Sequence, residues 1–153
     1  MPTKIFQVLT KEDTRYGKDL VTAVATIYPG LLVNFASSGA TLALGAAATK
    51  PEGFAFGLRH SIYRPTSTTF AAAEPVVIMQ GSGDALLSYD YFSSGSLPVA
   101  GNDLYSAADG LIATTGTHKF GHCIKQVTWV QGIGGTGTTA TCALIRFNFD
   151  SFA

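Results

Sequence analysis

From Leu20 onward the chain consists of short apolar and β-branched runs, and this pattern constrains its fold more than any other feature. The runs are rich in Val, Ile, Leu, Phe, Tyr and Thr, and Gly, Ser, Pro or Asn interrupts them at intervals of roughly 8 to 12 residues. Such spacing is typical of antiparallel strands joined by tight turns. We therefore predict a mainly β protein, either a β-barrel or a sandwich of short antiparallel strands.

The C-terminal strand has the clearest pattern. Leu144, Arg146 and Asn148 alternate with Ile145, Phe147 and Phe149, as expected for a strand with one buried face. Between two apolar runs, Asp109-Gly110 predicts a hairpin turn, because both residues tolerate positive φ. The same criteria predict strands at 31–35, 41–44, 54–62, 75–79, 85–91, 103–106, 111–114, 121–129 and 139–149.

The chain has 153 residues, the length of one ordinary domain. Residues 1–20 differ from the rest because they carry Lys4, Lys11, Glu12, Asp13, Arg15, Lys18 and Asp19. We expect an N-terminal arm at 1–20, either extended or with a short helix around Lys11–Lys18, and a single β domain at 21–153. Segments 29–80 and 100–149 resemble each other, which indicates two pseudo-repeats, although so short a match can also arise by chance.

Charged residues are scarce, at 13% of the chain against about 25% in a typical soluble domain. The formal net charge is zero, which favours association. Ten basic and ten acidic residues create no basic field for phosphates, so we expect no nucleic acid partner. No apolar run is long enough to cross a membrane, and no secretory signal follows Lys4, so we expect synthesis in the cytoplasm and no membrane partner.

Several motifs suggest chemistry that their context does not support. Gly132, Gly134 and Gly137 form a G-x-G-x-x-G pattern, but the following residues are β-branched and predict a hairpin loop without the helix that a dinucleotide requires. Ser82 lacks the spacing of a nucleophile elbow and more closely fits a turn. The histidines His60, His118 and His122, even with Cys123, do not provide a tetrahedral ligand set. We expect no catalytic residues, no metal and no cofactor, and hence no enzyme.

Cys123 and Cys142 lie on strands that we expect to be neighbours. A disulfide between them is geometrically possible, and two buried free thiols are the alternative that a reducing cytoplasm favours.

Aromatic and apolar residues near the chain ends have two interpretations. They either belong to the core or dock a partner, because aromatic anchors are common in interfaces. As candidate partner- or subunit-contact residues we name Ile5, Phe6, Arg15, Tyr16, Phe149 and Phe152.

The segment Gly95–Gly116, with Pro98-Val99, Gly101, Leu104-Tyr105 and Gly110-Leu111, resembles the small capsid decoration (cement) proteins of tailed bacteriophages. Pro29-Gly30-Leu31-Leu32-Val33 and Phe54-Ala55-Phe56-Gly57 are similar to the first part of the same proteins. The resemblance covers most of residues 29–149, and its motifs are turns and strands. Residues 1–20 match nothing in that family.

The resemblance implies a β-barrel or β-tulip domain. It also implies a structural virion protein on the capsid exterior that stabilises contacts between major capsid proteins. Its implied partners are the major capsid protein and further copies of itself, usually as a homotrimer. The alternative is a receptor- or carbohydrate-binding β module of a phage fibre or tail. That reading predicts aromatic side chains at loop tips, whereas the single tryptophan, Trp129, falls within a predicted strand.

Overall fold

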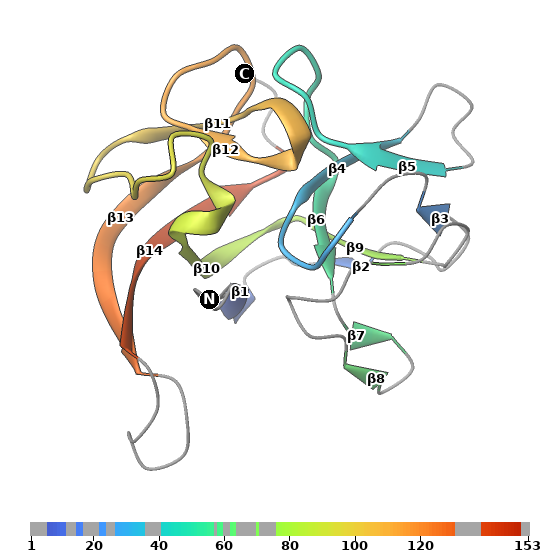
Figure 1. Ribbon diagram of the computed structural model, residues 1–153. Helices are drawn as coiled ribbons and strands as arrows, with labels where there is room; N and C mark the ends of the chain where they lie inside the picture. The colour runs from blue at the N-terminus through green and yellow to red at the C-terminus, as the bar shows by residue number, and fades with distance from the viewer. Residues whose placement is uncertain are drawn as a thin grey trace.

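The structure is a computed structural model, and it describes residues 6–11, 15–16, 22–23, 27–35, 41–56, 58–59, 62–63, 70, 76–130 and 139–150. Two six-stranded sheets pack face to face (Figure 1). The mainly β fold is confirmed. Among the described residues neither sheet closes on itself, so the architecture is a sandwich and not a barrel.

Sheet A has the order β1-β10-β14-β13-β11-β12, and all its pairs are antiparallel. Its strands are β1 (Phe6–Lys11), β10 (Ser82–Ser88), β14 (Thr139–Asn148), β13 (Lys119–Val130), β11 (Asp103–Ser106) and β12 (Ile112–Ala113).

Sheet B has the order β2-β9-β6-β4-β5-β3, and only its β3–β5 pair is parallel. Its strands are β2 (Arg15–Tyr16), β9 (Val77–Gln80), β6 (Gly53–Phe56), β4 (Leu32–Phe35), β5 (Thr41–Leu44) and β3 (Thr22–Ala23). A separate small ribbon pairs β7 (Leu58–Arg59) with β8 (Ile62–Tyr63). Two short 3₁₀ turns, η1 (Tyr89–Tyr91) and η2 (Ala108–Gly110), complete the described elements.

Most predicted strands are found within two or three residues of their expected bounds, and 41–44 and 103–106 agree at both ends. The Asp109-Gly110 turn is confirmed, with φ of 59° and 74° at these two residues. The single strand expected at 54–62 is wrong, because β7 and β8 pair with each other and the chain therefore reverses within that segment. The strand expected at 85–91 ends at Ser88, where η1 begins.

The described residues within 1–20 form strands of the two sheets. β1 pairs with β10 along one edge of sheet A, and β2 pairs with β9 along one edge of sheet B. A helix around Lys11–Lys18 is wrong at Lys11, Arg15 and Tyr16, which are in strands. The open edges of β10 and β9 offer backbone hydrogen bonds that an extended segment can satisfy and a helix cannot.

An aromatic cluster holds the two sheets together. Phe54 of sheet B has no exposed surface, and its ring lies 5.1 Å from Phe6, 5.3 Å from Phe147 and 5.0 Å from Phe149. A second apolar cluster covers the other face of sheet B, where Ile27, Phe70 and Val76 pack with residues of β4, β6 and β9. Along most of β4, β6 and β9, sheet B is therefore buried on both faces, which explains why these three strands are mostly apolar instead of alternating.

The two sheets have the same strand order. We call Arg15–Gln80 unit 1 and Ser82–Asn148 unit 2. The order β2-β9-β6-β4-β5 in unit 1 corresponds to β10-β14-β13-β11-β12 in unit 2. Even the parallel β3–β5 pair has a counterpart, because Phe92 forms a parallel bridge to Ile112 of β12. The match is wider than the segments 29–80 and 100–149 compared in the sequence.

The correspondence extends to individual hydrogen bonds. Gly30 (φ 97°) donates to the Ala55 carbonyl at 2.8 Å, and Gly101 (φ 89°) donates to the Cys123 carbonyl at 2.8 Å. Each glycine occupies a turn that needs positive φ, at the point where the chain enters β4 or β11. Gly53 and Gly121 also correspond, because a Cβ on either would overlap a backbone oxygen of the next strand.

Candidate functional site

Two of the six expected contact residues are buried in the core. Phe6 is 8% exposed and Phe149 is 5% exposed, and the Phe149 ring stacks on Phe120 at 5.4 Å. A contact role for Phe6 and Phe149 does not fit this burial, because side chains that fill the core present almost no surface to a partner. Their positions near the chain ends are explained by β1 and the end of β14, which carry them between the sheets.

The other four expected contact residues have no described side chains. Arg15 and Tyr16 form β2, where their backbones pair with Gln80 and Met79. Ile5 and Phe152 lie outside the described residues. A contact role for these four residues stays a prediction.

A row of charged and polar side chains crosses the outer face of sheet A. Asp84 lies opposite Arg146, Arg146 opposite His122, and His122 opposite Asp103. The Arg146 Nε donates to the Asp84 Oδ1 at 2.9 Å, and the Lys119 Nζ lies 2.9 Å from the Asp103 Oδ1. The hydrogen bond and negative charge of Asp103 raise the pKa of Lys119 above its ordinary value.

The corresponding row of unit 1 consists of apolar and aromatic residues, and those with described side chains are buried. There Tyr16 lies opposite Met79, Met79 opposite Phe54, and Phe54 opposite Leu32. Leu32, Phe54 and Met79 have no exposed surface. The face that carries this row therefore points into the sandwich in unit 1 and toward solvent in unit 2. The side chains of the row explain the difference, because burying the charged residues of unit 2 would be costly.

An apolar patch adjoins the charged row on sheet A. It comprises Leu86, Val127, Cys142 and Leu144, of which Leu86 and Cys142 are buried and the other two partly buried. Charged pairs beside an apolar patch are a common composition for a protein contact surface.

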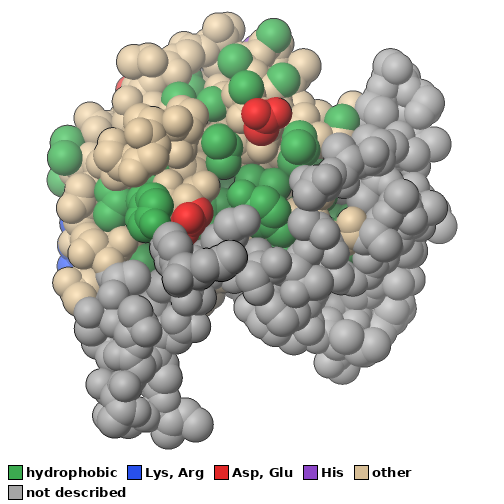
Figure 2. Space-filling model, viewed as in Figure 1, with side chains coloured by type: hydrophobic (Ala, Val, Ile, Leu, Met, Phe, Trp, Pro, Cys, Tyr) green, Lys and Arg blue, Asp and Glu red, His purple; other side chains and the backbone are tan. Residues whose placement is uncertain are grey.

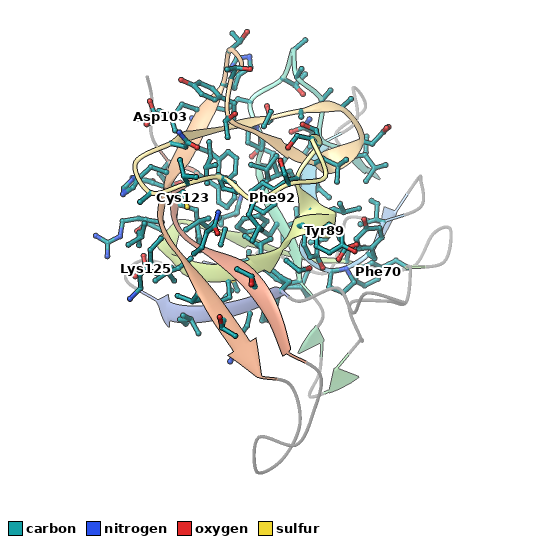
Figure 3. The ribbon with its side chains drawn as sticks, turned by 60° about the vertical axis from the view of Figure 1, so that its left-hand side comes forward. Phe70, Tyr89, Phe92, Asp103, Cys123 and Lys125 are labelled. Atoms are coloured by element: carbon teal, nitrogen blue, oxygen red, sulfur yellow. The ribbon has the colours of Figure 1, made fainter. Side chains whose placement is uncertain are left out.

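Cys123 and Cys142 lie on neighbouring strands but on opposite faces of sheet A. Cys123 belongs to the cluster between the sheets, whereas Cys142 belongs to the outer patch. Both are free thiols in the structure. Because their side chains lie on opposite faces of sheet A, the two sulfur atoms do not meet to form a disulfide. Burial raises the pKa of both thiols, and Figure 3 shows Cys123 among side chains of the interior, with Asp103 and Lys125 toward the outside.

The described histidines lie in different surroundings. A ring nitrogen of His118 is 3.2 Å from the Ala48 carbonyl oxygen, which links β13 to the loop after β5, and His122 belongs to the charged row. His60 and the glycines at 132, 134 and 137 lie outside the described residues. Ser82 is the first residue of β10 and directly follows Gly81, which has φ of 86°. Within the described ranges no three His, Cys, Asp or Glu side chains are grouped to hold a metal ion.

Large apolar side chains are exposed at several places. Leu9 is 45% exposed, Phe35 41%, Tyr89 40% and Val99 58%. They come from β1, β4, η1 and the loop before β11, so they are distributed over both sheets. Figure 2 shows hydrophobic side chains in several patches on one face of the molecule, with acidic side chains between them.

The chain was compared with known proteins. No protein family model matches it, and no curated protein sequence matches it. In the described part of the chain, no helix has the length and apolar character needed to cross a membrane.

Sequence reasoning did not identify the charged row or the outer patch. The alternation of Arg146 and Asn148 with buried residues did indicate that this face of β14 is exposed. The neighbours of Arg146 in this row could not be predicted from the sequence. Strand register places Asp84, His122 and Asp103 beside it, and register does not follow from local spacing.

Proposed function

We propose that this chain is a decoration protein that binds the outside of a tailed-phage capsid and stabilises contacts between major capsid proteins. The observation that supports it most is the character of the surface. The chain has 13% charged residues and zero net charge, and it exposes apolar side chains from both sheets. Such a surface favours broad contacts with other proteins over free diffusion as a monomer.

The resemblance of Gly95–Gly116 supports the same proposal. This segment forms the loop before β11, the β11–β12 hairpin and the approach to β13. It carries Val99, which at 58% is the most exposed large apolar side chain among the described residues. Binding repeated at many equivalent positions of a shell makes weak single contacts strong collectively.

The proposal is tested by adding purified protein to shells of the phage that lack it and measuring co-sedimentation. Saturable binding, together with a higher temperature of shell rupture, is expected. Val99→Asp should weaken binding by placing a charge in a contact, whereas Ser96→Asp, at an exposed polar position of the same loop, is the matched control. If Leu9→Asp, Phe35→Asp, Tyr89→Asp and Val99→Asp all leave binding unchanged, the exposed apolar side chains do not form the contact.

A further inference from the structure

The β13–β14 hairpin extends beyond the sheet that contains it. The pairing of β14 with β10 ends at the pair Ser88 and Cys142, and the pairing of β13 with β11 ends at His122. β13 and β14 remain paired with each other to Val130 and Thr139. Figure 1 shows this ribbon projecting from the body of the sandwich.

The register determines which backbone groups of the ribbon point outward. In an antiparallel ladder, opposite residues alternate between hydrogen-bonded and non-bonded pairs. Phe149 donates to the Gly81 carbonyl, so odd-numbered residues of β14 face away from β13. Thr141 is therefore a non-bonded partner of Thr128, and the N–H and C=O of Thr128 face the opposite edge of the ribbon.

By the same alternation, Gln126, Thr128 and Val130 direct their backbone groups to the outer edge of β13. Cys123 has this orientation too, because its N–H donates to the Asn102 carbonyl at 2.8 Å. Past Cys123, the described residues make no backbone hydrogen bond to this edge. An open edge of this length is a template for another strand.

Most of the described side chains on the β13 strand of the ribbon are exposed, and Val127 is the partly buried exception. In unit 1 the corresponding connection between β6 and β9 carries Phe70 and Val76, which cover sheet B. In unit 2 Lys125, Gln126 and Thr128 are exposed. A two-stranded ribbon is only marginally stable by itself in water, so further pairing would stabilise it.

We propose that the outer edge of β13, from Gln126 to Val130, pairs antiparallel with the same edge of a second copy of the chain. Thr128 then lies opposite Thr128 of the second copy, and Gln126 lies opposite Val130. Each outward N–H meets an outward C=O, so the backbone groups of the two edges satisfy one another. This interaction goes beyond the proposed function and does not depend on it.

Charge favours a second copy as the occupant of this edge. No charged residue occurs between Lys125 and Arg146, and the formal net charge of the chain is zero, so two copies do not repel each other. In the proposed register the two Lys125 residues are about six strand positions apart, roughly 20 Å, which exceeds the screening length in physiological salt.

An edge that pairs with itself closes a two-fold dimer, whereas a three-fold ring requires two different surfaces. The proposal therefore predicts a dimer and opposes the homotrimer that the resemblance implies. Molar mass measured by size-exclusion chromatography with light scattering should be twice the 16.0 kDa of one chain.

Two matched variants locate the contact. Thr128→Pro removes an N–H group that points to the outer edge of β13. Thr141→Pro removes the N–H group of its partner residue, which points to the other edge of the ribbon, along β14. Neither substitution deletes a β13–β14 hydrogen bond. Thr128→Pro should be monomeric and Thr141→Pro dimeric, with the fold of each checked by circular dichroism. As a measurement on the unmodified protein, amide exchange at Thr128 should slow at least tenfold as concentration rises through the dimerisation range.

The opposing results are equally definite. A wild-type monomer or trimer over the accessible concentration range overturns the proposal. A dimer that persists in Thr128→Pro also overturns it. Loss of the dimer in both variants overturns it as well, because association would then depend on the whole ribbon and not on the outer edge of β13. If a variant does not fold, unchanged exchange at Thr128 across concentration overturns it instead.

Discussion

Replacing Phe54 by alanine tests whether the aromatic cluster holds the two sheets together. Phe54 has no exposed surface, and its ring contacts those of Phe6, Phe120, Phe147 and Phe149 at centroid distances of 5.0–6.1 Å. Truncation of a buried phenylalanine costs about 3–5 kcal/mol. Because aromatic pairs contribute about 0.5–1.5 kcal/mol beyond their buried area, we expect a loss near the top of that range.

A loss of about 4–5 kcal/mol is a large part of the about 5–15 kcal/mol that stabilises a typical domain. For a chain of this length it corresponds to a fall in Tm of about 10 °C or more. Thermal and urea unfolding followed by circular dichroism measure both quantities. Phe35→Ala is the matched control, since Phe35 is 41% exposed and lies in the neighbouring strand β4. Because more than half of the Phe35 surface is buried, we expect a smaller but measurable loss of about 1–2 kcal/mol.

Phe54→Ala would contradict the described core if it cost less than about 1.5 kcal/mol, within the range of tolerated hydrophobic exchanges. The same conclusion would follow if Phe35→Ala were equally costly. Either result would mean that the two sheets are held together by contacts other than the Phe54 cluster.

The remaining predictions concern single groups in the core. Tyr91→Phe removes a buried hydroxyl that donates to a backbone carbonyl at 2.7 Å, and urea unfolding should show a loss of about 1–3 kcal/mol; no change would refute the role of this bond. Gly121→Ala forces a Cβ into a backbone oxygen of β14 and should lower Tm more than Gly95→Ala. A Cβ at Gly95 has space around it and meets only the strain of a φ of 69°, so equal Tm values would contradict the close approach at Gly121. Burial raises the pKa of Cys123 and Cys142 above 9.0, so the stability linked to them is complete below that pH and declines above it. Unfolding free energies at about pH 8 and about pH 10 should differ less in the variant with both cysteines replaced by alanine, and an equal difference would refute the linkage.

The sequence was sufficient to predict the fold class and most strands because alternation and turn residues are local signals. Asp109-Gly110 is an example, since its two positive φ values follow from the residue types. The division into an arm at residues 1–20 and a domain at 21–153 stays a prediction. The burial of Phe6 could not be predicted from the sequence, because it depends on the edge of β10, which is distant in sequence. The orientation of unit 2 likewise depends on the row from Asp84 to Asp103, which only strand register assembles.

The proposed role on a capsid is tested most directly by electron cryo-microscopy of shells prepared with and without this protein. The proposal predicts added density at repeated positions on the outer surface, in contact with more than one capsid subunit. Identical shells in the two preparations, or density only on a tail or fibre, would contradict it.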